Sequence, residues 1–120
     1  MIHGAVYNSR PLISLTIGWK SKTQDVTALI DTGFTGELKI SRKEANELGI
    51  QVTHTEPVTL ADENTVDMSA GLAQVSMDGI QKTMEVLISD GMPIIGVGLL
   101  KKFGYILNIN FPSSVVSLKR

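Results

Sequence analysis

Asp31 is the residue of this sequence that is best placed to do chemistry. It follows the apolar run Ala28-Leu29-Ile30 and precedes Thr32 and Gly33. A carboxylate at the end of a buried strand loses solvation, so it must be held by hydrogen bonds or used chemically. Gly33 lets the backbone turn tightly and offers its N–H to the carboxylate, and Thr32 supplies a hydroxyl that can hold the turn. The tripeptide alone fits an ordinary strand-end turn as well as a catalytic carboxylate.

Two further segments are candidates to build a site around Asp31. Ile94-Ile95-Gly96 is an apolar piece bounded by glycines, and residues 99–103 predict a short helix ended by Gly104. Residues 62–64 are polar and stand between two predicted strands, which is typical of the tip of a projecting hairpin. These segments and the strand before Asp31 must position the carboxylate.

Short strands dominate the rest of the sequence. Asp78-Gly79 is a strong hairpin-turn signal, and Ser41 and Glu44 have the spacing of a capping box, so a helix is predicted over residues 42–48 with Gly49 as its stop. Many short strands with closely spaced turns predict a small closed β-barrel. The predicted strands are residues 13–17, 26–30, 38–40, 58–61, 65–77, 80–88, 105–109 and 115–118.

Two stretches of the chain share one pattern. Residues 29–49 and 94–104 both have an apolar strand, a glycine turn and then a short helix. A pair of half-units related by a twofold axis inside one domain would produce this echo.

At these positions the sequence resembles the retropepsin-like aspartic peptidases, and looks closest to their small bacterial single-domain members. Leu29 to Gly33 match the apolar-apolar-Asp-Thr-Gly core of that family, Ile94-Ile95-Gly96 matches its second element, and residues 60–66 fall where it has a β-hairpin flap. The resemblance spans residues 11–111. It implies a mainly β fold, a small closed β-barrel of the retropepsin-like type with one or two short helices and a flap hairpin, as a single domain over residues 1–120.

The resemblance implies peptide-bond hydrolysis by two facing carboxylates and one water, with no metal or organic cofactor. Like charges at such short range cannot both ionise comfortably, so the pair shares a proton. The chain contains one Asp-Thr-Gly, because Asp78-Gly79 and Asp90-Gly91 lack the preceding apolar strand. A complete site therefore requires a homodimer in which Asp31 meets its symmetry mate.

The family pattern also implies supporting roles. Thr32 would bond across the dimer axis, Gly33 would let the two loops approach, and Ile94, Ile95 and Gly96 would pack against the loop. The flap would close over an extended peptide or protein substrate and exclude water. Its residues would be Ala61, Asp62, Glu63, Asn64, Thr65 and Val66.

The sequence departs from the family pattern in three respects. Phe34 follows Gly33 where retroviral enzymes usually have a small residue, so its ring is expected to narrow a subsite or to pack the loop. The flap tip contains no glycine, which predicts a turn that is stiffer or of different shape, and the flap contains no tyrosine, so the phenol that assists in pepsins is missing. The pattern leaves open whether residues 1–7 and 115–119 interleave in the dimer as retroviral terminal strands do.

Composition narrows the classes of partner. The 120 residues carry 11 basic and 12 acidic side chains, a formal net charge of −1 with no basic stripe, so nucleic acid is not an expected partner. No apolar run has the length of a membrane span, and no signal peptide is evident. The absence of cysteine excludes disulfides and cysteine nucleophiles and fits the cytoplasm. His3 and His54 lie far apart without metal-ligand spacing nearby, so no metal site is expected.

Two other interpretations of the same sequence remain open. A non-catalytic peptide-binding or adaptor domain could use the same fold, with Asp31 retained for the shape of its loop. A homodimeric assembly module without a substrate groove is the third possibility. An intact Asp31-Thr32-Gly33 favours the enzyme over both.

Overall fold

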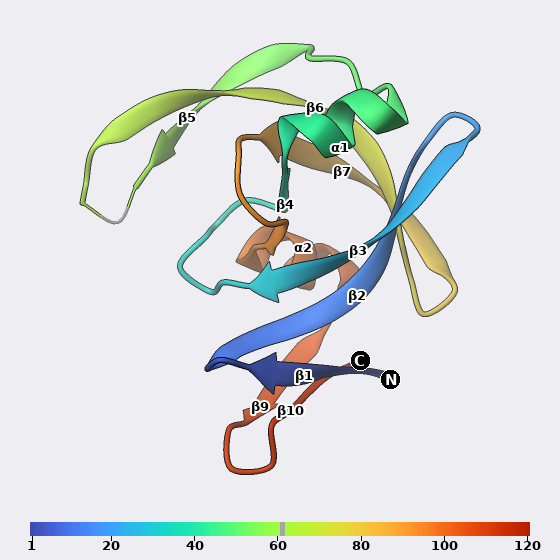
Figure 1. The fold of residues 1–120 in the computed structure, drawn as a ribbon, viewed down its shortest axis with the longest axis vertical. Helices are drawn as coiled ribbons and strands as arrows, with labels where there is room; N and C mark the ends of the chain where they lie inside the picture. The colour runs from blue at the N-terminus through green and yellow to red at the C-terminus, as the bar shows by residue number, and fades with distance from the viewer. Residues whose placement is uncertain (61) are drawn as a thin grey trace.

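The computed structural model of the chain describes residues 1–60 and 62–120. Strands make up most of the described part, with two short helices, as Figure 1 shows. The elements in chain order are β1 (Ile2–Tyr7), β2 (Arg10–Trp19), β3 (Lys22–Ile30), β4 (Leu38–Ile40), α1 (Arg42–Leu48), β5 (His54–Thr59), β6 (Thr65–Met77), β7 (Ile80–Ile88), β8 (Ile94–Ile95), α2 (Val97–Phe103), β9 (Ile106–Asn110) and β10 (Val115–Lys119).

The strands form one sheet that closes on itself. Its order is β5-β6-β7-β4-β8-β3-β2-β1-β10-β9, and β6 also pairs with β2, so the strands from β6 to β2 make a closed ring. β5 continues the sheet beyond the ring at one end, and β1, β10 and β9 continue it at the other. The prediction of a mainly β fold with one or two short helices is confirmed, and the predicted closed sheet is this ring.

The core fills the inside of the ring. Ile13, Leu15 and Ile17 alternate along β2 and are at most 4% exposed, and Val26, Ala28 and Ile30 alternate along β3 and are at most 7% exposed. Such alternation places every second side chain on one face of a strand. Leu99 and Phe103 of α2 complete the core, together with apolar side chains from the other ring strands.

The strand pairings have an internal exchange symmetry. β2-β3-β4-α1 and β6-β7-β8-α2 follow each other with the same order of elements. β3 pairs in parallel with β8, and β7 pairs in parallel with β4. β2 pairs antiparallel with β6, and β4 with β8. If each element of β2-β3-β4-α1 is exchanged with its counterpart in β6-β7-β8-α2, the same set of pairings results. This agrees with the pair of half-units that the repeated strand-turn-helix pattern predicted.

Local signals set the helix ends. Ser41 and Glu44 form a complete capping box on α1, and Gly49 closes this helix in the left-handed conformation at φ 74°. The prediction for residues 42–48 is thus confirmed. α2 begins at Val97, two residues before the predicted start, and ends at Gly104 as predicted.

The hairpins follow the turn signals, with one difference. Asp78 and Gly79 both have positive φ and join β6 to β7, as their residue types predicted. β5 runs over His54–Thr59, whereas a strand was predicted over 58–61. The terminal strands β1 and β10 pair with each other inside this chain. In the described part of the chain, no helix combines the length and apolarity that a membrane crossing requires.

Candidate active site

The backbone of β8 holds Asp31 at the end of β3. Leu29 and Ile30 pair in register with Ile94 and Ile95 of β8. The Asp31 N–H donates to the Ile95 carbonyl oxygen at 3.0 Å, one step beyond the last paired residues. The predicted second element, Ile94-Ile95-Gly96, therefore lies directly beside the strand that carries Asp31.

The Asp31 carboxylate is fixed by its own loop. The Gly33 N–H donates to Asp31 Oδ1 at 2.9 Å, as expected from the sequence, and the Phe34 N–H donates to the Asp31 carbonyl oxygen at 3.1 Å. This backbone hydrogen bond fixes the orientation of the carboxylate. Asp31 is half-buried, and Thr32 and Gly33 are exposed. Thr32 and Gly33 thus remain accessible to a partner molecule.

Glycines let the start of α2 pack closely against the loop that follows Asp31. The Gly96 and Val97 N–H groups donate to the carbonyl oxygens of Glu37 and Phe34 at 3.1 and 2.8 Å. A Cβ on Gly96 would lie 2.2 Å from the Gly36 carbonyl oxygen and 2.6 Å from Phe34 Cδ2, so only glycine fits there.

Phe34 packs the loop from within. Its side chain is half-buried, and a Cβ on Gly36 would lie 2.5 Å from Phe34 Cζ, so the ring lies against this glycine. Gly98 donates its N–H to the Gly36 carbonyl oxygen at 3.0 Å. Of the two expected roles of Phe34, packing the loop is the one that these contacts show. The supporting roles of Gly36 and Gly98 were missed, and their only signal was small size in two segments far apart in sequence.

The β5–β6 hairpin lies on the side of the molecule where β3 ends (Figure 1). Its tip is closed by Leu60 N–H donating to the Asn64 carbonyl oxygen at 2.8 Å, and by the Asp62 carboxylate, which accepts from the Asn64 N–H and side-chain amide. Glu63 takes the left-handed conformation, at φ 69°, that a glycine would usually supply. Ala61 lies outside the described residues.

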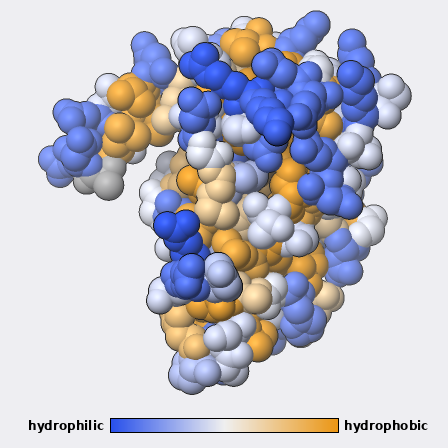
Figure 2. Space-filling model, in the orientation of Figure 1, coloured by the Kyte–Doolittle hydropathy of each residue, from blue (hydrophilic) through white to orange (hydrophobic). Residues whose placement is uncertain are grey.

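The hairpin is mostly exposed toward its tip. Thr65 pairs with Thr59, and Val66 pairs with Val58 and is 38% exposed. Figure 2 shows the hairpin projecting from the body, with hydrophilic side chains at its end and apolar ones behind them. An exposed hairpin with apolar side chains is suited to covering an extended ligand.

Lys39 is a charged neighbour of this region that the sequence did not single out. It pairs directly with Ile94 across β4 and β8, and its Nζ donates to the Asp90 carbonyl oxygen at 2.9 Å. Burial lowers the pKa of Lys39, and the carboxylates of Glu44 and Asp90 offset part of that fall. The loop before β8 therefore holds a cation beside the strand that supports Asp31.

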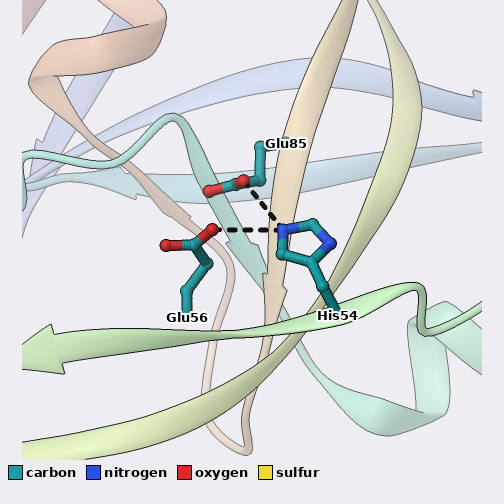
Figure 3. A group of neighbouring side chains, drawn as sticks. All are labelled: His54, Glu56 and Glu85. Carbon is teal, nitrogen blue, oxygen red and sulfur yellow. Dashed lines mark hydrogen bonds and ion pairs between the residues drawn. The ribbon is translucent and has the colours of Figure 1, made fainter.

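The structure also brings together side chains that the sequence left apart. His54 lies within hydrogen-bond distance of the carboxylates of Glu56 and Glu85 (Figure 3). Spacing along the sequence did not indicate this cluster, because sheet register brings Glu85 to His54.

Comparison with known proteins concerns the fold. No family model matches the sequence, and no curated protein matches it. A retropepsin-like aspartic protease from Rickettsia conorii superposes with a TM-score of 0.66 at 17% identity, covering 98% of this chain and 88% of that one. EIAV protease in complex with the inhibitor HBY-793 superposes with a TM-score of 0.64 at 17% identity, covering 86% of this chain and 98% of that one. The chain therefore has the retropepsin-like fold.

Proposed function

We propose that this protein is an aspartic endopeptidase that is active as a homodimer, with the Asp31 carboxylates of the two chains as its catalytic pair. The observation that carries the proposal is the position of Asp31 at the end of β3, with its carboxylate oriented by the Gly33 N–H at 2.9 Å, on a retropepsin-like fold. Carboxylate orientation by backbone donors is what general acid–base catalysis requires.

The requirement for a homodimer comes from the number of carboxylates. The sequence contains Asp-Thr-Gly once, so a single chain supplies half of a catalytic pair. Thr32 and Gly33 are exposed beside Asp31, where a second loop could meet them. Tyr7, Phe111 and Val115 are large apolar side chains that are 41–67% exposed in the single chain, so they are available to a second copy.

The proposed mechanism uses one water and one shared proton. Two carboxylates about 3 Å apart cannot both be charged, so one Asp31 is ionised and the other is protonated. The ionised Asp31 accepts a proton from the water as its oxygen attacks the peptide carbonyl carbon, and the protonated Asp31 donates to the carbonyl oxygen. The diol then collapses, the C–N bond breaks and the leaving nitrogen takes up a proton. The pair returns to its starting state.

The β5–β6 hairpin is proposed to cover the substrate. An extended peptide can add hydrogen bonds to the hairpin backbone while alternate side chains enter pockets. The exposed Leu60 and Val66 would supply apolar contact, and closure would exclude water from the pair.

The test compares wild-type protein with Asp31→Asn on a diverse peptide library, at a concentration where sedimentation shows dimer. Wild type should cut and Asp31→Asn should not. Asp25→Asn is the matched control, because Asp25 lies on the same strand and its carboxylate is occupied by the Thr16 hydroxyl at 2.6 Å. Equal cutting by wild type and Asp31→Asn would refute the proposal.

An equal mixture of wild type and Asp31→Asn tests whether each chain supplies only half of an active site. If each active site needs two Asp31 carboxylates, random pairing in an equal mixture leaves about one quarter of the dimers active. A site complete within one chain would leave about one half of the activity. A dimer that binds peptides in a groove and cuts none of them would instead support the adaptor interpretation.

A further inference from the structure

His54, Glu56 and Glu85 project from one face of the sheet at the root of the β5–β6 hairpin. His54 and Glu56 are two residues apart on β5, so their side chains share a face. His54 pairs with Ala70 of β6, which pairs with Leu87 of β7, and Glu85 stands two residues before Leu87. The three side chains therefore meet above β6. His54 and Glu56 come from β5 and Glu85 comes from β7, and these two strands do not pair with each other.

The three ligating atoms already have spacings that suit a metal ion. His54 Nε2 lies 3.1 Å from Glu85 Oε2 and 3.2 Å from Glu56 Oε1 (Figure 3). One ligand atom from each residue lies within 4.8 Å of the others. Tetrahedral zinc with bonds of about 2.0–2.2 Å holds its ligands roughly 3.4 Å apart. Small side-chain rotations would admit the ion without any movement of the strands.

The hydrogen bonds of Thr53 orient the imidazole for this role. Thr53 Oγ1 lies 2.8 Å from His54 Nδ1 and 3.5 Å from the Ala70 carbonyl oxygen. With an ion bound at Nε2, Nδ1–H would donate to the Thr53 hydroxyl oxygen, and the hydroxyl proton would turn toward the Ala70 carbonyl oxygen, which can only accept. An outer hydrogen bond that fixes the tautomer in this way is typical of metal-bound histidine.

The charge of the cluster calls for a cation. The cluster sets two acidic side chains against one imidazole. Within residues 1–60 and 62–120, the ion pairs formed by Glu56 and Glu85 are with His54 alone. Lys102 pairs with a different carboxylate, that of Glu37, at 3.5 Å. A divalent ion would balance both carboxylates, whereas the imidazole by itself can offer one positive charge at most.

We propose that His54, Glu56 and Glu85 bind a divalent transition-metal ion, with Zn²⁺ as the best match to one nitrogen and two oxygen ligands. Imidazole favours zinc and its neighbours over Mg²⁺ and Ca²⁺, which prefer all-oxygen sites. The side chains are 38–39% exposed, so water can complete the coordination. The ion would join β5 to β7 across β6 and so fix the root of the hairpin to the ring. This proposal does not depend on peptidase activity.

The test measures thermal unfolding of untagged, metal-stripped protein with ZnCl₂ or MgCl₂. Zinc at about 100-fold above its Kd should raise the Tm of the wild type by on the order of 5–10 °C, and Mg²⁺ should not. His54→Gln and Glu85→Gln should lose this rise, each compared with its own metal-free Tm. His3→Gln is the matched control, because it removes the other histidine of the chain and should keep the rise.

Cobalt gives a second readout. Co²⁺ bound by His54 should show visible absorption bands that are absent in His54→Gln. Thr53→Val should weaken zinc binding about 10–100-fold, as expected for loss of an outer partner. An unchanged wild-type Tm with zinc, or an equal rise in His54→Gln, would overturn the proposal.

Discussion

Replacing Gly96 with alanine tests whether close packing of α2 shapes the Asp31 loop. The added Cβ would lie 2.2 Å from the Gly36 carbonyl oxygen and 2.7 Å from that of Phe34. Both are backbone atoms, so the loop itself would have to move by about 1 Å to restore ordinary contact.

The expected cost follows from two contributions. Forcing a methyl group into a packed site costs about 1–3 kcal/mol. The movement also strains three hydrogen bonds, from the N–H groups of Gly96, Val97 and Gly98 to the loop, each worth about 0.5–1.5 kcal/mol. We expect Gly96→Ala to lower the free energy of unfolding by about 2–4 kcal/mol, a large share of the roughly 5–15 kcal/mol typical of a domain.

Urea denaturation measures this loss, with Gly49→Ala as the matched control. Gly49 has φ 74°, and a Cβ added to it would meet no atom within 4 Å, so its substitution tests backbone conformation alone and should cost about 1 kcal/mol. The peptidase activity of Gly96→Ala should fall further than its folded fraction does. The reasoning fails if Gly96→Ala loses less stability than Gly49→Ala.

Four further predictions concern stability. Ser41→Ala removes the capping box and should cost about 0.5–2 kcal/mol in urea denaturation, whereas Ser113→Ala should change little. The Tyr105 hydroxyl is buried and, among the described residues, has only the Arg120 guanidinium as a weak partner, so Tyr105→Phe should raise the Tm slightly. Burial also raises the pKa of Tyr105, and Arg120 offsets part of the rise. As the pH rises above about 10, the unfolded state loses the Tyr105 proton before the folded state does. The free energy of unfolding of the wild type should therefore fall above about pH 10, and that of Tyr105→Phe should fall less. The lowered pKa of Lys39 gives a pH dependence of the opposite sign. Below about pH 10.5 the unfolded state holds the Lys39 proton more tightly than the folded state, so the free energy of unfolding should rise with pH as folded Lys39 deprotonates. This rise should vanish in Lys39→Met.

Signals contained in a few neighbouring residues were readable from the sequence. The capping box of Ser41 and Glu44 fixed the prediction of α1, and Asp78-Gly79 fixed that of the β6–β7 turn. The Gly33 hydrogen bond to Asp31 is equally local, because it spans two residues. In each case the conformation depends on side chains that act on their own backbone.

Features set by register between distant segments were not readable. β5 was placed too late because Pro57 looks like a strand boundary. In the structure β5 is the edge strand of the sheet, where a missing N–H is tolerated. Glu85 reaches His54 only through two successive strand pairings, and Gly36 meets Gly98 just beyond the pairing of β4 with β8.

The exchange of strands between the two halves has a consequence for folding. β3 finds its parallel partner in β8, and β4 finds its own in β7, so neither half can satisfy its backbone without the other. Contacts between such distant segments slow folding, and they make it an all-or-none event. Formation of the Asp31 loop is then coupled to closure of the whole ring. A fragment that ends before β6 should therefore be unfolded and lack the loop altogether, even though it contains every residue from Asp31 to Glu37.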